Sequence, residues 1–512
     1  MRCAQLIAAL SLAAASTLAA GAAPTDWQAK VDPWLLGRAQ RAGQVEALIL
    51  LDRQADLSAA RGLRTKEEKG RYVFEQLQRT AAETQGPLLG ELDAMGAEHR
   101  SYWVANMVWV RTGAAGLQAL AERSDVRHLF ANPQVKMALP RPTAIDDGSV
   151  GNAPFTTEWG VNKVNAPALW AQGFSGQGIV VGGEDTGYDW NHPALKNKYR
   201  GWNGSAADHN YNWHDSIHSG GGSCGANSTQ PCDDNGHGTH TMGSMVGDDG
   251  AGNQVGVAPG ARWIGCRNMD QGNGTPTTYS ECFQFFIAPT DLAGQNPDPS
   301  KSPHVINNSW GCPTSEGCTD PTVLQMVVEN TRAAGIVVVV SAGNSGSGCS
   351  TVNTPAAIYD AAFSVGATDI NDNIASFSSR GPVTVDGSNR PKPDISGPGV
   401  NVRSSLPGGS YGNLSGTSMA GPHVVGSVAL LLSASPGLVG DQDAVETCLE
   451  QNAMPRTSGQ TCGGVPGTNI PNNTFGYGRV QVPWPLPANC LAGLFADGFE
   501  TGDTTAWAAQ VP

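Results

Sequence analysis

The sequence is poor in charged residues, which make up 15% of its 512 residues, where soluble domains typically contain about 25%. It also lacks any excess of positive charge. The formal net charge is −14, which argues against nucleic acid and anionic membrane surfaces as partners. After the N-terminus no run approaches 18 consecutive apolar residues, so we predict no membrane span. Hydrophobic residues still make up 40%, enough for a sizeable core, so the chain does not have the composition of a disordered protein.

The 11 cysteines include no C-x-x-C pair, which weakens zinc and thioredoxin-type interpretations. Residues 1–22 resemble a secretory signal peptide, with Arg2, an apolar segment and the small residues Ala20-Gly21-Ala22. The alternative is a buried helix of the mature protein. Export implies an oxidising compartment and leaves ten cysteines, an even number that indicates disulfides. The short-range pairs that the spacing suggests are Cys224–Cys232, Cys312–Cys318 and Cys448–Cys462.

Charge is unevenly distributed along the chain. Residues 24–140 hold 15 basic and 14 acidic residues, whereas residues 141–512 hold 15 basic and 31 acidic ones. Glycine is abundant at 65 residues and follows no collagen-like repeat, which indicates many tight turns and close backbone contacts. The chain therefore contains two regions of different character that meet near residue 140.

The first region, residues 24–140, has the pattern of a small α+β domain. Strands are expected at 45–51, 102–110 and 126–130, with helix over 66–95 and 114–123. The predicted order is β-α-β-α-β. A proline-bearing stretch at 139–154 has the character of a linker.

The second region, residues 155–482, alternates apolar runs with helical segments. Strands are expected at 178–181, 263–266, 304–307, 336–340 and 363–365, and helices at 238–246, 322–334 and 418–433. Near-continuous apolar runs between helices predict an α/β fold with a mainly parallel sheet buried on both faces. Residues 483–512 show little periodicity and are interpreted as a C-terminal tail.

Three short motifs carry the chemistry. Glu184-Asp185-Thr186-Gly187 follows a predicted strand, where α/β folds place their sites. His237 lies between glycines just before a helix, and Ser418 opens an apolar helix. Together the three residue types suggest nucleophilic acyl transfer, in which a histidine takes the serine proton and a carboxylate orients the histidine. The order Asp…His…Ser differs from that of α/β-hydrolases and of trypsin-like enzymes.

The motifs Asp185-Thr186-Gly187, His237-Gly238-Thr239-His240 and Gly416-Thr417-Ser418-Met419-Ala420 resemble those of subtilisin-like (subtilase, S8) serine endopeptidases. His192-Pro193-Ala194-Leu195 and Arg403-Ser404-Ser405 are most similar to the bacillopeptidase F-type branch. The resemblance implies a three-layer subtilisin-like fold. It also implies Asp185 as orienting carboxylate, His237 as general base and acid, and Ser418 as nucleophile.

The resemblance also extends to the substrate site. Asn344, in Ser341-Ala342-Gly343-Asn344, would donate its side-chain amide to the oxyanion. Ser309-Trp310-Gly311 would pair with the substrate backbone, and Ala342 and Gly343 would line the S1 pocket with it. Trp310 departs from the leucine common in subtilisins. Broad specificity with some apolar preference at P1 is expected.

No cofactor is required for this chemistry. The family often carries calcium, and Asp233-Asp234 and Asp248-Asp249 could serve as ligands or form a solvated acidic loop, so no metal ligands are assigned. His240 and His423 are interpreted as structural residues.

The first region then resembles an I9-type propeptide with a ferredoxin-like α+β fold, which acts as an intramolecular chaperone and inhibitor. We expect self-cleavage between Val135 and Thr157 and a secreted enzyme that acts on extracellular proteins and peptides. Two alternatives remain open: an inactive protein-binding scaffold of the same fold, and an esterase that uses the same three residues.

Overall fold

A seven-stranded sheet runs through the second part of the chain, and all of its strand pairs are parallel. The computed structural model describes residues 26–137, 140–146 and 156–491. The predicted signal peptide, most of the predicted linker and residues 492–512 of the predicted tail lie outside the described residues. In spatial order the strands are β17 (Ile395–Pro398), β16 (Phe363–Thr368), β15 (Val337–Ser341), β14 (Val305–Asn308), β8 (Val180–Asp185), β11 (Arg262–Arg267) and β9 (Trp213–Asp215).

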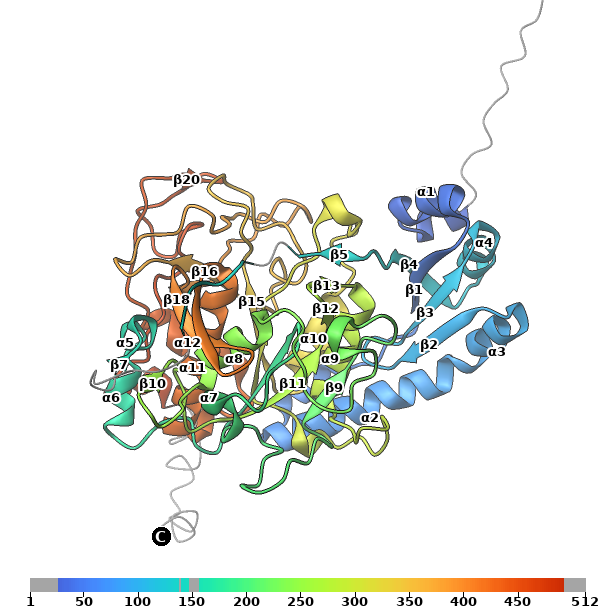
Figure 1. Cartoon of the computed structure of the whole chain (residues 1–512). Coiled ribbons are helices and arrows are strands. Elements are labelled where there is room, and N and C mark those ends of the chain that lie inside the picture. The colour runs from blue at the N-terminus through green and yellow to red at the C-terminus, as the bar shows by residue number, and fades with distance from the viewer. Residues whose placement is uncertain (1–25, 138–139, 147–155, 492–512) are drawn as a thin grey trace, which may run out of the picture.

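Helices cover both faces of this sheet and make three layers (Figure 1). On one face lie α8 (His237–Val246) and α11 (Thr417–Ala434); on the other lie α9 (Pro276–Ile287) and α10 (Gln325–Ala333). The strands supply both faces because successive side chains point to opposite sides. Val339 packs with the α8 and α11 side, and Val338 packs with the α9 and α10 side. The predicted α/β class and parallel sheet are confirmed.

Shorter elements surround this body, which we call the main unit (residues 156–491). The helices are α5 (Trp159–Lys163), α6 (Ala166–Trp170), α7 (Pro193–Lys196) and α12 (Gln442–Gln451). The strands form the pairs β7 (Thr156–Thr157) with β10 (Asn253–Gln254), β18 (Val402–Leu406) with β19 (Ser410–Leu414), β12 (Met269–Asp270) with β13 (Asn273–Gly274), and β20 (Thr461–Cys462) with β21 (Val465–Pro466).

Residues 26–137, the N-terminal unit, form a separate α+β body with four antiparallel strands in the order β2-β3-β1-β4. Its elements are α1 (Pro33–Ala42), β1 (Val45–Leu51), α2 (Lys66–Thr84), α3 (Gly86–Met95), β2 (Glu98–Tyr102), β3 (Met107–Thr112), α4 (Ala114–Glu122) and β4 (Val126–Ala131). The expected single strand over 102–110 is wrong, because the chain turns back near Asn106 (φ 43°) and makes a hairpin. The order is therefore β-α-β-β-α-β, the ferredoxin-like arrangement.

One face of the N-terminal sheet serves its own core and the other packs on the main unit. Ala47 and Ile49 point toward α3 and α4, whereas Leu48 and Leu50 pack with residues of α9 and α10. In Figure 1 this unit, in blue, stands beside the main unit and α2 runs along it. The alternation of β1 thus divides its apolar side chains between an internal core and an interface.

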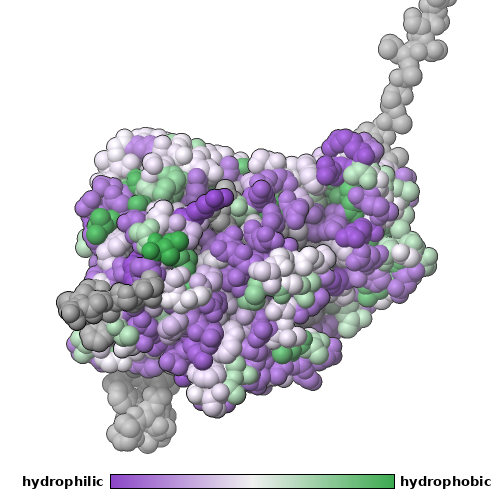
Figure 2. Space-filling view, in the orientation of Figure 1, coloured by the Kyte–Doolittle hydropathy of each residue, from purple (hydrophilic) through white to green (hydrophobic). Residues whose placement is uncertain are grey.

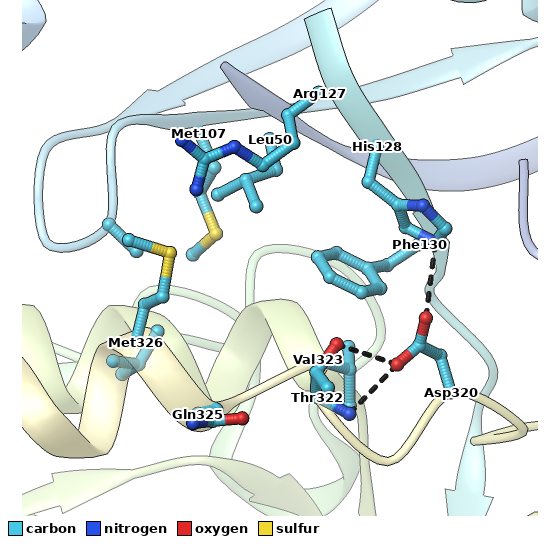
Figure 3. A pocket seen from close by; sticks show the side chains of 12 residues that line it. Leu50, Met107, Arg127, His128, Phe130, Asp320, Thr322, Val323, Gln325 and Met326 are labelled. Atoms are coloured by element: carbon cyan, nitrogen blue, oxygen red, sulfur yellow. Dashed lines mark hydrogen bonds and ion pairs between the residues drawn. The ribbon is translucent and has the colours of Figure 1, made fainter. Parts of the chain in front are cut away.

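The interface also contains a cavity of about 360 Å³ (Figure 3). Leu50, Met107 and Phe130 of the N-terminal unit line it opposite Met326. At its edge His128 faces Asp320, with 3.2 Å between Nε2 and the carboxylate. The cavity belongs to the contact between the two units and does not include the residues predicted for catalysis.

Two segments connect the N-terminal side of the chain to the main unit as added strands. β5 (Val135–Lys136) pairs antiparallel with β13, and β6 (Thr143–Asp146) pairs antiparallel with β19. The second lies within the stretch interpreted as a linker, so part of that stretch is ordered structure. Two nitrogens of the Arg403 guanidinium, Nε at 2.9 Å and Nη2 at 2.8 Å, donate to the Asp146 carboxylate and fasten it to the main unit.

All ten cysteines of the described residues form disulfides within the main unit. The pairs are Cys224–Cys232, Cys266–Cys282, Cys312–Cys318, Cys349–Cys462 and Cys448–Cys490. Two of the suggested short-range pairs are confirmed, and Cys448–Cys462 is wrong. Cys448 on α12 is 5.2 Å in Cα distance from Cys490 instead, so residues 483–490 are held on the main unit, where Trp484 packs against Phe174.

The face shown in Figure 2 is mostly hydrophilic or neutral, with small separated hydrophobic areas. α11 is the one helix of the described residues whose length and composition would allow it to cross a membrane, and 89% of it is buried inside the protein. It contacts α8 and the strands β14 to β17. We therefore assign α11 to the core.

Candidate active site

The residues predicted for catalysis gather at one edge of the sheet. Asp185 ends β8, Ser309 follows β14, and Asn344 follows β15 by three residues. Because these three strands are neighbours and parallel, their carboxyl ends meet at the same edge. Asp185 and Asn344 are more than 150 positions apart in the sequence, and the βαβ crossovers bring them together.

Asp185 and His237 are in direct contact. The Asp185 Oδ1 atom lies 2.7 Å from His237 Nδ1, and both side chains are fully buried. The carboxylate is fixed further by the Thr186 backbone N–H at 2.7 Å and by the Thr241 hydroxyl at 3.3 Å. A buried carboxylate at Nδ1 holds one imidazole tautomer and turns Nε2 toward the site.

The glycines beside His237 are required by its surroundings. Gly236 adopts a left-handed conformation (φ 99°) before the first turn of α8. A Cβ on Gly238 would lie 2.1 Å from the Gly187 carbonyl oxygen and 3.0 Å from the Asp185 side chain. Any larger residue would push α8 away from the Asp185 motif.

Asp233 supports the same region from the preceding loop. Its carboxylate accepts hydrogen bonds from the Thr239 N–H (2.9 Å) and hydroxyl (2.6 Å), from the Gly236 N–H (2.8 Å) and from the Thr186 hydroxyl (2.9 Å). These bonds satisfy donors at the start of α8 and tie α8 to the Asp185 motif. From the sequence, Asp233 was considered as a calcium ligand or as part of a solvated acidic loop, and its structural role was missed.

Ser418 is the second residue of α11, where almost every side chain is buried. Its hydroxyl lies 3.5 Å from the Ser309 carbonyl oxygen, and the Ser309 hydroxyl donates to the Ser418 carbonyl at 3.2 Å. His237 Nε2 is buried and makes no hydrogen bond within the described residues. The structure thus joins Asp185 to His237 and Ser418 to Ser309, while the Ser418 hydroxyl is not hydrogen-bonded to His237. Such contacts often tighten only when substrate binds.

Asn344 lies at the exposed mouth of the site. Its Oδ1 atom accepts hydrogen bonds from the Thr417 N–H (2.9 Å) and hydroxyl (3.0 Å). These bonds orient the amide so that its N–H₂ group faces away from Thr417. Gly343, with φ 103°, lies beside the same threonine, whose hydroxyl accepts from its N–H at 3.3 Å. Thr417 therefore places the predicted amide donor next to Ser418.

Trp310 is buried rather than exposed to the site. Its ring stacks on Tyr279, with 3.9 Å between centroids and 12° between planes. The backbone of Ser309 to Gly311 is at the sheet edge, and Ala342 follows the neighbouring strand. The predicted substrate segments are thus adjacent, but the side chain of Trp310 belongs to the core below them.

A hairpin that sequence reasoning missed lies opposite these segments. It consists of β12 and β13, and β5 of the N-terminal unit extends it as a third strand. The Met137 N–H donates to the Gly272 carbonyl at 3.0 Å, and Val135 packs on the Cys312–Cys318 disulfide. The only hint in the sequence was the turn-forming Gln271-Gly272 pair after an apolar run.

The other conspicuous histidines have structural partners. His240 Nε2 lies 3.0 Å and 3.1 Å from the carbonyl oxygens of Val402 and Gly412, and burial lowers the pKa of His240 to about 3. Burial also lowers the pKa of His423 to about 4, and its Nδ1 faces the Met419 carbonyl. Both rings are neutral donors at physiological pH.

The acidic pairs considered for calcium are engaged by protein groups. Asp234 pairs with the buried Arg267 at 2.6 Å. Asp249 accepts from the Asn253 amide at 2.7 Å and from the Tyr411 hydroxyl at 3.2 Å. Within residues 26–137, 140–146 and 156–491, no group of three or more candidate ligands could hold a metal ion.

The chain is similar in sequence to known proteins. A family profile described as "Subtilase family" matches residues 176–478. The chain is 36% identical to Bacillopeptidase F of Bacillus subtilis (strain 168) over 443 residues, which cover 83% of this chain and 29% of that protein. It is 34% identical over 281 residues to Subtilisin E of the same organism and to Subtilisin of Bacillus pumilus, covering 54% of this chain and 61% and 85% of those proteins.

The chain spans less than a third of the length of Bacillopeptidase F. The similarity still reaches beyond the main unit, because 83% of the chain is more than residues 156–512 could supply. At least part of the N-terminal unit therefore belongs to what the two proteins share.

Proposed function

Because the chain belongs to the subtilase family, we propose that it is a secreted serine endopeptidase that hydrolyses peptide bonds of extracellular proteins through an acyl-enzyme intermediate. The observation that carries this proposal is the buried Asp185–His237 contact of 2.7 Å at the sheet edge where Ser309, Asn344 and the start of α11 meet.

In the proposed mechanism His237 takes the Ser418 proton as the hydroxyl attacks the substrate carbonyl. Asp185 stabilises the imidazolium that forms, and His237 then returns the proton to the leaving amine. The Asn344 amide and the Ser418 backbone N–H stabilise the developing oxyanion. Water then attacks the acyl-enzyme while His237 takes its proton, and His237 returns that proton to the Ser418 oxygen as the acid product leaves. No metal or cofactor enters these steps.

Substrate is proposed to bind as an extended strand between β13 and the backbone of Ser309 to Gly311, with Ala342 and Gly343 lining S1. Support comes from β5, which pairs with β13 in this way. Main-chain pairing of this kind gives affinity that depends little on sequence. The proposed specificity is therefore broad.

We further propose that the N-terminal unit, bounded at about residues 24–140, is a propeptide that chaperones and inhibits the main unit. It presents Val135 to Met137 to the proposed substrate hairpin, and its sheet covers α9 and α10. Self-cleavage between Val135 and Thr157 would separate it from the enzyme. Export by way of residues 1–22 fits the five disulfides of the main unit.

Activity is tested with casein in the presence and absence of phenylmethylsulfonyl fluoride. We expect cleavage that the inhibitor abolishes, and Ser418→Ala should show none. A purified, folded wild-type chain that cleaves neither casein nor any peptide would contradict the proposal and favour the scaffold alternative. Parallel ester substrates show whether peptides are the better substrates.

Processing is tested with the same Ser418→Ala variant. We expect it to accumulate as a single species that is larger than the mature form by the N-terminal unit and part of the linker, roughly 115–135 residues, a typical size for one small domain. Mass spectrometry measures both termini. Normal processing of this variant in a pure preparation would show that another protease makes the cut.

A further inference from the structure

Two carboxyl groups stand next to each other in the chain at the centre of the candidate site. Glu184 and Asp185 are the last residues of β8, and both are fully buried. Because strand side chains alternate, Asp185 faces α8 and Glu184 faces the α9 side of the sheet. The proposed mechanism uses Asp185 and leaves Glu184 without a role. Burying a carboxyl group costs free energy unless it has a hydrogen-bond partner.

The partner of Glu184 is the side-chain amide of Asn268. The Asn268 Nδ2 donates to Glu184 Oε2 at 2.8 Å. The remaining oxygen of each group, Glu184 Oε1 and Asn268 Oδ1, is buried and has no hydrogen-bond partner within the described residues. An ionised carboxylate and an amide oxygen can only accept, so neither of these two atoms could satisfy the other.

A proton on the Glu184 carboxyl group would give both of these buried oxygen atoms a hydrogen-bond partner. A carboxylic acid and a carboxamide form a ring of two hydrogen bonds, in which the amide N–H donates to one carboxyl oxygen and the acid O–H donates to the amide oxygen. We propose that Glu184 is a neutral carboxylic acid locked in such a ring with Asn268, and that it acts as a positioning residue for Asp185 and for the substrate hairpin. The consequence for substrate rests on the function proposed above.

The surroundings favour the neutral acid. Burial raises the pKa of Glu184 well above its usual value, the Asn268 hydrogen bond opposes this, and the charge of Asp185 raises it further. The other titratable groups near it are the phenols of Tyr188 and Tyr279, whose pKa values burial also raises. None of the ion pairs found among the described residues includes Glu184. In the part of the chain that the structure describes, no cation pairs with Glu184 to stabilise a second negative charge.

The ring connects the catalytic carboxylate to the proposed substrate hairpin. The Asn268 N–H donates to the Asp185 carbonyl at 2.9 Å, and the Asn268 carbonyl accepts from the Thr278 hydroxyl at 2.8 Å, at the start of α9. Asn268 also directly precedes β12. Keeping Glu184 neutral leaves Asp185 as the one ionised member of the pair, so adjacent carboxyl groups take different roles because their environments differ.

Infrared difference spectroscopy tests the protonation directly. The full chain carrying Ser418→Ala is compared with and without Glu184→Gln at neutral pH, in H₂O and D₂O. We expect the wild-type Glu184 chain to show a carboxylic-acid carbonyl band that is absent in Glu184→Gln. Glu281→Gln is the matched control: Glu281 is also buried, but hydrogen bonds from His214 and His218 outweigh burial and lower its pKa, so its loss should remove no acid band. An unchanged acid band in Glu184→Gln would overturn the proposal.

Asn268→Leu gives a second readout that does not depend on the Gln variant folding. It removes both the donor and the acceptor of the ring, so the Glu184 acid band should shift to the position of a more weakly hydrogen-bonded acid. A band that does not move in a folded Asn268→Leu chain would also overturn the ring. Neither spectroscopic result depends on proteolysis, so failure here and failure of the proposed function are distinguishable.

Kinetics test the positioning role. Glutamine can form the same two-bond ring with asparagine, so Glu184→Gln should rescue the kcat/KM that Glu184→Leu loses, by about tenfold, the effect of leaving a buried amide unpaired. Raising the pH until Glu184 ionises should lower wild-type activity reversibly, and Glu184→Gln should lack that alkaline decline. Equal kcat/KM for the Leu and Gln variants, or an alkaline decline that persists in Glu184→Gln, would overturn the positioning role.

Discussion

The N-terminal unit and the main unit are held together by different means. The main unit contains all ten cysteines of the described residues, in five disulfides, and its sheet is buried on both faces. The N-terminal unit contains no disulfide in its described residues and uses one face of its sheet for its own core and the other for its partner. The main unit is therefore cross-linked covalently, whereas the N-terminal unit is attached to it by non-covalent contacts and by the chain itself.

The contacts between the units support this distinction, because each is local and non-covalent. The Asn330 amide donates to the Val104 carbonyl at 2.7 Å, and the Gln284 side-chain oxygen accepts from the Trp103 N–H at 2.8 Å. Lys66 of the N-terminal unit is buried against Ser302 of the main unit, and burial lowers the pKa of Lys66 to about 8. The interface therefore combines apolar area with a buried cation that lacks a carboxylate partner within the described residues.

The largest expected effect is the loss of stability when a disulfide is removed from the main unit. Cys349 and Cys462 close a loop with a sequence separation of 113 residues. Replacing both with serine should lower the stability of the main unit by about 4–5 kcal/mol in the chain-entropy model. Denaturant unfolding of the Ser418→Ala chain measures this. The Cys224–Cys232 pair, with a separation of 8, is the short-loop control, and an equal loss for both pairs would contradict the argument.

The main unit is expected to cleave the chain's own linker with the same site that cleaves peptides. Asn344→Ala should lower kcat by about 100- to 1,000-fold with little change in KM, a range that itself comes from a subtilisin. If cleavage of the chain's own linker uses the same oxyanion donor, the rate of processing should fall by the same factor. Pulse-chase processing and peptide assays compare the two. If Asn344→Ala hydrolyses peptides slowly but is processed at the normal rate, the N-terminal unit is not cleaved as a substrate of this site.

The smallest predicted effect is on the pH dependence of the contact. Tyr102 of the N-terminal unit donates to Glu281 at 2.8 Å, and His214 and His218 lie 2.8 Å and 2.9 Å from the same carboxylate. Burial lowers the pKa of His218, but the hydrogen bond to Glu281 outweighs burial, so the pKa of His218 is raised overall. The positive charge of Arg100 opposes this rise. Docking of the N-terminal unit brings Arg100 close to His218 and buries His218 further, and both effects lower the pKa of His218. His218 therefore binds a proton more tightly when the two units are apart.

Acidification through neutral pH should therefore weaken docking, by about tenfold for each unit of difference in the His218 pKa. Hydrogen exchange of β2 and α9 in the Ser418→Ala chain measures opening between about pH 8 and pH 6. The His214→Gln/His218→Gln variant should flatten the dependence. His128→Gln is the control, because it removes the His128–Asp320 contact at another place in the same interface. Docking that tightens in acid would contradict the prediction.

Much of the main unit could be predicted from the sequence because its strands are continuous apolar runs. The predicted strand at 336–340 is β15 shifted by one residue, and the three motifs predicted for catalysis fall at element ends, where local turn chemistry marks them. Short strands such as β9 and β17 contain too few residues to show a pattern. The hairpin of β2 and β3 was read as one strand because its turn contains no Gly or Pro.

The supporting groups of the site could not be predicted because they depend on contacts between distant segments. Asp233 is recognisable as part of an acidic pair, but only the fold shows that it bonds to Thr186 and Thr239. Cys448 could have paired with several cysteines, and the choice of Cys490 follows from where α12 places it. Glu184 has no pattern of its own, and its significance depends on the amide of Asn268.

The position of Ser418 on α11 also determines how the proposed activity should be lost on heating. The helix is packed against α8 and four strands of the central sheet, so the serine cannot move far without disrupting the core. Inactivation should therefore coincide with global unfolding and show no earlier, partial loss from local loosening. Residual activity after a heat pulse would then serve as a direct assay of how much of the main unit remains folded.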